Sequence, residues 1–136
     1  MNTRTYMLDT NTVSALLSRS PQPVLNRLRA AGSERTSISS IVYGEVRYGL
    51  SKNPTAIRFL ETAEKFFAEI AILPWMASTA EQYGTLRAEM RRTGRALQPL
   101  DILIAAHALE ARAVLVTRDQ AFRHVPGLTV EDWSSQ

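Results

Sequence analysis

Residues 113–119 read Ala-Val-Leu-Val-Thr-Arg-Asp, and this stretch says most about the fold. A continuous apolar run of this length is typical of a strand buried on both faces of a parallel sheet. A second apolar run, Tyr6-Met7-Leu8, lies near the start of the chain and is followed directly by Asp9. Each run therefore has an Asp at or just beyond its carboxyl end, where open parallel sheets bind ligands.

Short apolar runs alternate with helical patterns along the rest of the chain. We expect strands near 4–8, 36–38, 71–73, 113–117 and 128–130. We expect helices near 11–19, 22–31, from Ser39 or Ser40 to about Leu50, and near 54–70, 77–93 and 99–112, with a short one near 119–124. This alternation predicts an α/β fold with a mostly parallel central sheet of about four or five short strands and helices on both sides.

Composition limits the class of protein. The chain has 136 residues, which predicts one domain over 1–136. Hydrophobic residues make up 45% and charged residues 21%, which excludes wholesale disorder. The sequence has no Cys, so disulfides, thiolate zinc sites and cysteine nucleophiles are excluded. We find neither a signal peptide nor an apolar run long enough to cross a bilayer, and we expect a soluble, cytoplasmic protein without a membrane partner.

The formal net charge of +3 is a mild basic bias, compatible with a partner that carries phosphates. Among the cations only Lys52 and Lys65 are Lys, and the others are Arg. Arg is favoured for bidentate contacts with phosphate and carboxylate groups. A GC-rich genome that favours Arg codons explains the same bias, so both explanations stay open.

The Asp residues are few, and their positions carry information. They are Asp9, Asp101, Asp119 and Asp132. Asp9 and Asp119 follow the first and the fourth expected strands, at the same edge of one sheet. A single Asp at such a place usually caps a helix, but two at one edge favour a ligand site. Asp132, near the end of the chain, is expected to be solvated.

Two further acids lie on apolar helices. Glu45 falls on the apolar stripe of its helix, four residues after Ile41 and three after Val42, and Asp101 lies in the first turn of a helix that is apolar nearly all round. A carboxylate that faces a core is costly unless it is paired or bound to a cation. The alternatives are a Glu whose head group reaches solvent and an Asp that only complements the helix dipole.

Together, Asp9, Glu45, Asp101 and Asp119 form a candidate catalytic and metal-binding set. Oxygen ligands of this kind suit Mg²⁺ or Mn²⁺. Such an ion polarises a phosphodiester and activates a water for in-line attack. Asn11 and Thr117 are placed to orient water or ligands beside the set.

Other polar patterns are weaker. Arg87, Arg91 and Arg95 recur every four residues and are candidates for a track that binds phosphates beside the acidic set, although a solvated helix face explains the same spacing. The stretch from Gly44 to Ser51 imitates a P-loop but has Leu50 in place of its lysine. His107 and His124 lack metal-ligand spacing, and we expect structural or surface roles for them.

The order of these pieces resembles the PIN-domain ribonucleases, specifically the VapC toxins of type II toxin–antitoxin pairs. The resemblance covers essentially the whole chain. It rests on the stretches Met7-Leu8-Asp9-Thr10-Asn11, Ser37-Ile38-Ser39, Tyr43-Gly44-Glu45, Asp101-Ile102-Leu103-Ile104-Ala105-Ala106-His107-Ala108, Val116-Thr117-Arg118-Asp119-Gln120-Ala121-Phe122 and 126–133. One departure is Gln98-Pro99-Leu100 before Asp101, where many relatives have smaller or more polar residues.

The resemblance implies a PIN fold and an acidic pocket that holds Mg²⁺ or Mn²⁺. By motif, Asp9 and Asp101 match direct metal ligands, Glu45 matches a further acidic position, and Asp119 matches the fourth, less strictly acidic one. It also implies selective cleavage of RNA, a homodimer, inhibition of growth, and control by a VapB-type antitoxin through which the complex binds operator DNA.

We therefore expect a metal-dependent endoribonuclease that acts as a toxin. Alternatives are a PIN nuclease of RNA or DNA processing and a PIN binding module without catalysis. A phosphatase of the haloacid dehalogenase type fits poorly, because Asn11 replaces the second Asp of its opening motif.

Overall fold

The computed structural model describes residues 3–135 and contains one five-stranded parallel sheet. The strands are β1 (Tyr6–Leu8), β2 (Thr36–Ser39), β3 (Ala71–Leu73), β4 (Val114–Val116) and β5 (Val130–Glu131). The helices are α1 (Thr10–Ser18), α2 (Gln22–Ala31), α3 (Ser40–Lys52), α4 (Ile57–Glu69), α5 (Ala77–Arg92) and α6 (Pro99–Ala111), with 3₁₀ helices η1 (Ser33–Arg35) and η2 (Gln120–His124). The predicted α/β fold with a parallel sheet is confirmed.

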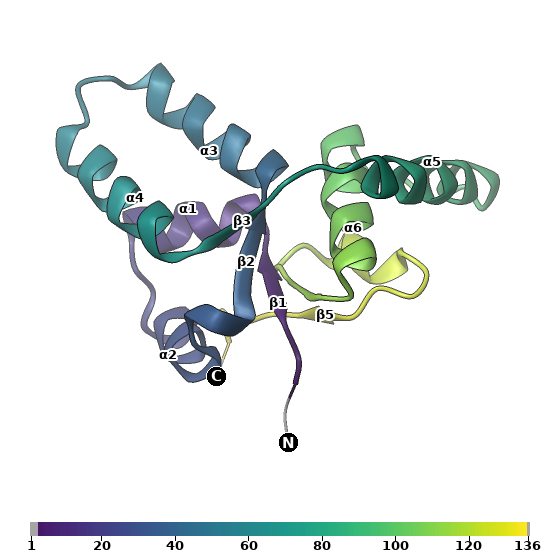
Figure 1. Cartoon of the computed structure of the whole chain (residues 1–136), viewed down its shortest axis with the longest axis horizontal. Helices are drawn as coiled ribbons and strands as arrows, with labels where there is room; N and C mark the ends of the chain where they lie inside the picture. Colours follow the sequence, from purple (N-terminus) through teal and green to yellow (C-terminus); the bar gives the residue numbers. More distant parts are fainter. Residues whose placement is uncertain (1–2, 136) are drawn as a thin grey trace.

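The strand order β3-β2-β1-β4-β5 explains how the helices are divided. The chain steps from β1 to β2 and then to β3 in one direction, and it returns across the sheet between β3 and β4. Because such crossovers are right-handed, the two directions place their helices on opposite faces. Figure 1 shows α1 to α4 on one side of the strands and α5 and α6 on the other. The order reverses between β1 and β4, which is where parallel sheets bind ligands.

The core lies around the central strands. All three residues of β4 are buried, as the continuous apolar run predicts. On one face α6 covers the sheet with a run of small side chains that includes Ala105, Ala106 and Ala108, each fully buried. Small side chains let a helix approach the strands closely, so α6 is held firmly against the sheet. In the described part of the chain no helix is both long and apolar enough to cross a membrane.

Several predicted boundaries were too wide. The strands predicted over 4–8 and 113–117 are limited to Tyr6–Leu8 and Val114–Val116, because these are the residues that pair with each other. The last strand is Val130–Glu131 rather than 128–130, since it pairs with Leu115 and Val116. The helix predicted from Pro54 begins at Ile57, and the short helix near 119–124 is 3₁₀.

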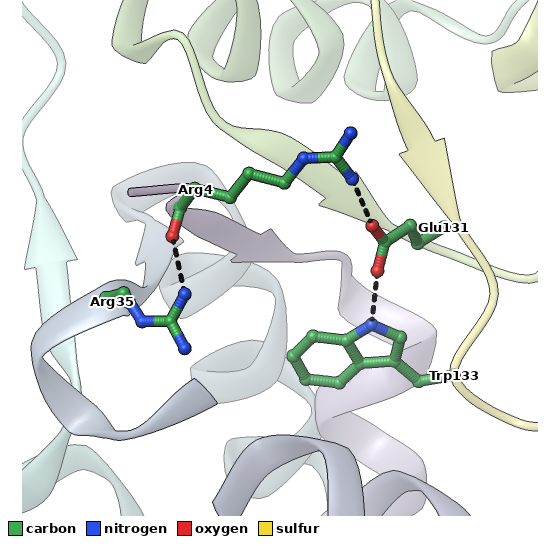
Figure 2. A network of polar contacts seen from close by, with 4 residues as sticks. All are labelled: Arg4, Arg35, Glu131 and Trp133. Atoms are coloured by element: carbon green, nitrogen blue, oxygen red, sulfur yellow. Dashed lines mark hydrogen bonds and ion pairs between the residues drawn. The ribbon is translucent and has the colours of Figure 1, made fainter. Parts of the chain in front are cut away.

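Hydrogen bonds and an ion pair join the segment around β5 to Arg4, just before β1 (Figure 2). Arg4 Nη1 donates to Glu131 Oε2 at 2.9 Å, and the Trp133 indole N–H donates to Glu131 Oε1 at 3.0 Å. Arg35, from η1, donates to the Arg4 carbonyl at 3.3 Å. The Trp133 ring is buried against Tyr6, with ring centroids 5.2 Å apart. These contacts hold the C-terminal segment in a fixed place beside α1 and α2.

Candidate active site

The four acidic side chains singled out above line one pocket. Asp9 follows β1, Asp119 precedes η2, Glu45 lies in the middle of α3 and Asp101 in the first turn of α6. The pocket has a volume of about 160 Å³, and its other lining residues are Thr10, Asn11, Ile104 and Phe122. Four elements that are far apart in the sequence thus bring their carboxylates to one place.

The sheet register accounts for the nearness of Asp9 and Asp119. β1 and β4 run parallel, with Leu8 opposite Val116, and the Asp9 backbone N–H donates to the Val116 carbonyl at 3.1 Å. Asp9 therefore leaves the sheet at the level of Thr117, two residues before Asp119. Both acids lie at the carboxyl edge, where the strand order reverses.

The two helices that carry Glu45 and Asp101 each begin at a residue that favours a helix N-terminus. α3 begins after Ser39, whose Oγ accepts from the Ile41 N–H at 3.0 Å, and this cap fixes the direction in which Glu45 is presented. α6 begins at Pro99, whose fixed φ suits a first helical position. Asp101 then lies in the first turn, where the helix dipole favours a negative charge.

Three of the carboxylates are oriented by hydrogen bonds within the chain. Asp9 Oδ1 accepts from the Thr12 N–H at 2.8 Å, and Asp119 Oδ1 accepts from the Ala121 N–H at 2.9 Å. Glu45 Oε1 accepts from the Thr10 hydroxyl at 3.0 Å. A carboxylate has about four lone-pair sites, so these bonds fix the groups and leave acceptor capacity for a cation.

One carboxyl group of the pocket, that of Asp101, has a shifted pKa. Burial raises the pKa of Asp101 above its usual value, and the negative charges of Asp119, Glu45 and Asp9 raise it further. Across residues 3–135 no three Asp, Glu, His or Cys side chains are gathered into a ready-made metal site. The four acids lie on separate walls of the pocket, and the charges of the other three act on Asp101. An all-oxygen, negatively charged set of this kind fits a hard divalent cation.

The two neutral residues predicted beside the acids lie next to them. Asn11 is exposed and lines the pocket. Thr117 is buried, and its Oγ1 accepts from the Asp119 N–H at 3.0 Å, so it holds the turn that presents Asp119. Thr10, which hydrogen-bonds Glu45 across 35 positions of sequence, was not predicted. Nothing in the local sequence around Thr10 signals such a distant partner.

The predicted arginine set lies outside the acidic pocket. Arg87 donates to the Tyr83 hydroxyl at 2.7 Å, Arg91 is exposed, and Arg95 approaches His124 at 3.4 Å. A larger groove adjoins the acidic pocket and shares Asn11 and Asp119 with it, and the arginines that line this groove are Arg19 and Arg118. Arg118 could have been suspected from its place directly before Asp119. Arg19 has no such signal.

Comparison with known proteins places the chain in a family. Residues 6–128 match the PIN domain family. The chain is 34% identical to the "Ribonuclease VapC2" of Rickettsia felis over 94% of this chain and 97% of that protein. It is also 34% identical to the "tRNA(fMet)-specific endonuclease VapC" of Salmonella typhimurium, again over 94% and 97% of the two chains.

Among solved structures, the fold matches the VapBC2 complex of Rickettsia felis bound to a DNA fragment from its promoter. The TM-score is 0.87 at 32% sequence identity, and the match covers 94% of this chain and 98% of the other.

Proposed function

The chain belongs to the PIN domain family and, within it, to the VapC ribonucleases, and from that premise we propose that it is an endoribonuclease serving as the toxin of a type II toxin–antitoxin pair. The observation that carries the proposal is the placement of Asp9, Glu45, Asp101 and Asp119 around one small pocket at the switch point of the sheet. A phosphodiester is the substrate that such a set of acids suits best when a divalent cation is present.

Asp9 and Asp101 are the direct metal ligands in this proposal, and Glu45 and Asp119 complete the set. Bound Mg²⁺ or Mn²⁺ supplies Lewis-acid polarisation of the scissile phosphate and activation of the attacking water. The observation that favours a cation is the raised pKa of the half-buried Asp101, which burial and the charges of the three other acids lining the pocket both raise. A divalent ion relieves that repulsion.

The chain's own residues provide orientation. Thr10 holds one oxygen of Glu45, Thr117 holds the backbone of Asp119, and the Thr12 N–H holds one oxygen of Asp9. These bonds fix the carboxylates before substrate arrives, so less ordering is needed during the reaction. Ile104 and Phe122 form the apolar part of the lining, and Phe122 is 2% exposed. Their low polarity strengthens the electrostatic interactions in the pocket.

The partners follow from the relatives. The matching structure from Rickettsia felis is a toxin–antitoxin complex on promoter DNA. For this chain we accordingly infer a VapB-type antitoxin and contact with operator DNA through the antitoxin alone, and the homodimer stays a prediction from the family resemblance. The Salmonella relative is named as specific for tRNA(fMet), so tRNA is the first RNA class to test here.

The test is cleavage of total cellular RNA by antitoxin-free protein with Mg²⁺, with Mn²⁺ and with EDTA. Asp9→Asn is the informative variant, because Asn keeps the helix cap and removes the charge. Glu61→Gln removes a charge at an exposed position of α4, away from the pocket, and is the matched control.

We expect discrete fragments that require a divalent ion and Asp9 and that Glu61→Gln does not affect. Intact RNA from folded wild type supplied with metal would contradict the proposal and favour a binding module. Cleavage that persists in Asp9→Asn would contradict the assigned site. Growth arrest on expression, reversed by a co-encoded small protein, separates a toxin from an RNA-processing nuclease.

A further inference from the structure

A groove of about 780 Å³ adjoins the acidic pocket. The two share Asn11 and Asp119, so the groove opens from the side of the pocket where Asp119 lies. Its walls are α1, the start of α2, the turn between β4 and η2, and the C-terminal segment that the Trp133 contacts hold in place. The groove is therefore continuous with the proposed site of cleavage.

The lining of the groove is hydroxyl-rich and carries two exposed guanidinium groups. Ser14, Ser18 and Ser134 contribute hydroxyls, and Arg19 and Arg118 are exposed at its walls. Trp133 also borders the groove, but its ring is only 2% exposed and is packed on Tyr6. A buried ring offers no platform for stacking a base, so the lining suits phosphates better than bases.

We propose that this groove seats the single-stranded RNA on one side of the scissile phosphate, with Arg118 and Arg19 binding its backbone phosphates. The inference rests on the proposed function and deepens it, because it names the path that the substrate takes away from the acids. Arg presents a planar fork of donors that matches a phosphate. A polymer cut among four carboxylates also needs positive charge nearby to offset their repulsion of its backbone.

Asp132 places a negative charge in the same groove, so removing it should affect RNA binding in the opposite direction from removing an arginine. It was expected to be solvated, but it is half-buried and lines the groove. Its Oδ1 accepts from the Ser134 N–H at 2.8 Å and from the Ser134 hydroxyl at 2.5 Å. These bonds lower the pKa of Asp132, and the charges of Arg118 and Arg123 lower it further. The charge of Arg118 thus acts on Asp132, and in this proposal the Asp132 anion opposes the binding of phosphate at Arg118.

The test measures binding of a fluorescein-labelled single-stranded RNA 20-mer of mixed sequence to the full chain in EDTA, over a series of salt concentrations. Cleavage of the same RNA with Mg²⁺ is measured in parallel. Arg118→Gln and Arg19→Gln remove one charge each from the groove, and Asp132→Asn removes the competing anion. Arg58→Gln removes an exposed charge from α4 and is the matched control.

We expect Arg118→Gln and Arg19→Gln each to weaken binding about three- to tenfold at about 0.1 M salt. Each should also reduce the slope of log K against log salt by about 0.7, the value for one phosphate of a single strand. Asp132→Asn should tighten binding about two- to fivefold, and Arg58→Gln should match wild type. Because the altered side chains are exposed or only lose a charge, thermal melts should stay close to wild type.

The outcomes separate the subsite from the activity. If wild type cuts RNA while Arg118→Gln and Arg19→Gln bind it with unchanged affinity and slope, the groove proposal is wrong and the nuclease stands. If wild type neither binds nor cuts RNA, both fail together. If the two variants lose affinity for a co-purified antitoxin but not for RNA, the groove belongs to the protein partner, and the proposal is overturned.

Discussion

His107 of α6 places its Nδ1 2.7 Å from the Oγ of Ser39, the residue that caps α3. A hydrogen bond with the Pro74 backbone ties the same imidazole to the residue after β3, and the Trp75 ring packs on it with centroids 5.4 Å apart. α6 carries Asp101 and α3 carries Glu45, so this buried contact joins the two helices that supply carboxylates to the pocket. The expected structural role of His107 agrees with this position.

The first prediction concerns stability in acid. Burial lowers the pKa of His107 below its usual value, and the charge of Glu110 and the hydrogen bond with the Pro74 backbone oppose that shift only in part. Above the pKa of unfolded histidine, about 6.5, both states hold a neutral ring and the group has no effect on the pH slope. As the pH falls below that value, the unfolded chain takes up a proton that the folded chain resists, and stability is lost.

His107→Asn should therefore abolish part of this acid slope. Urea midpoints measured between about pH 7.5 and 5 should fall more steeply in wild type than in His107→Asn, although the variant starts from a lower stability at neutral pH. His124→Asn, which removes the exposed histidine, should keep the wild-type slope. Parallel slopes for wild type and His107→Asn would show that His107 does not carry the effect.

A second prediction concerns the cap itself. Ser39→Ala removes the acceptor for the Ile41 N–H and the partner of His107, so the free energy of unfolding should fall by about 1–3 kcal/mol. Because the two residues are in contact, the Ser39→Ala, His107→Asn double variant should depart from additivity by about 0.5 kcal/mol or more. Ser18→Ala, at an exposed site, should change stability by less than about 0.5 kcal/mol. Additive losses would mean that the serine and the imidazole act independently.

A third prediction concerns Thr10. Thr10→Val removes the hydroxyl that orients Glu45 and keeps the shape of the side chain, so cleavage should fall about three- to tenfold. Thr10→Ser keeps the hydroxyl and should retain most activity. The assay is the initial rate on one RNA at saturating Mg²⁺, with melting curves to confirm folding. Equal rates for the Val and Ser variants would exclude an orienting role.

The positions of the acids could be predicted because they depend on local patterns and on one general property of parallel sheets. Asp9 follows β1, Asp119 lies just beyond β4, and the carboxyl ends of these two short strands meet at one edge of the sheet. The roles assigned to these acids remain predictions. The hydrogen bond from Thr10 to Glu45 joins residues on separate elements, so no local pattern reveals it.

The groove could not be predicted for a related reason. It exists because residues 132–134 lie beside α1 and the start of α2, held by Glu131 and by the packing of Trp133 on Tyr6. Such a wall is a tertiary feature that sequence periodicity does not encode. The same fold places Arg19 in the lining of the groove. The regular spacing of arginines in α5 instead predicted a role for Arg91, which lines neither the pocket nor the groove.

The last prediction sets stability against activity at Asp101. Its pKa is raised by burial and by the three neighbouring acids. An acid whose folded pKa is raised favours the folded state below its unfolded pKa, about 3.9, and loses that contribution as the pH rises through the folded value. At neutral pH without metal, the Asp101 carboxylate thus lowers the stability of the folded state, so Asp101→Asn should raise the melting temperature in EDTA while lowering RNA cleavage at least about 100-fold.

Mg²⁺ or Mn²⁺ should then raise the melting temperature of wild type and have little effect on Asp101→Asn, because only the full acidic set binds the ion tightly. Glu61→Gln, at an exposed position on α4, should respond to metal as wild type does. A variant that is less stable than wild type in EDTA, or that gains as much from metal, would show that the four acids do not form one mutually repelling, cation-binding group.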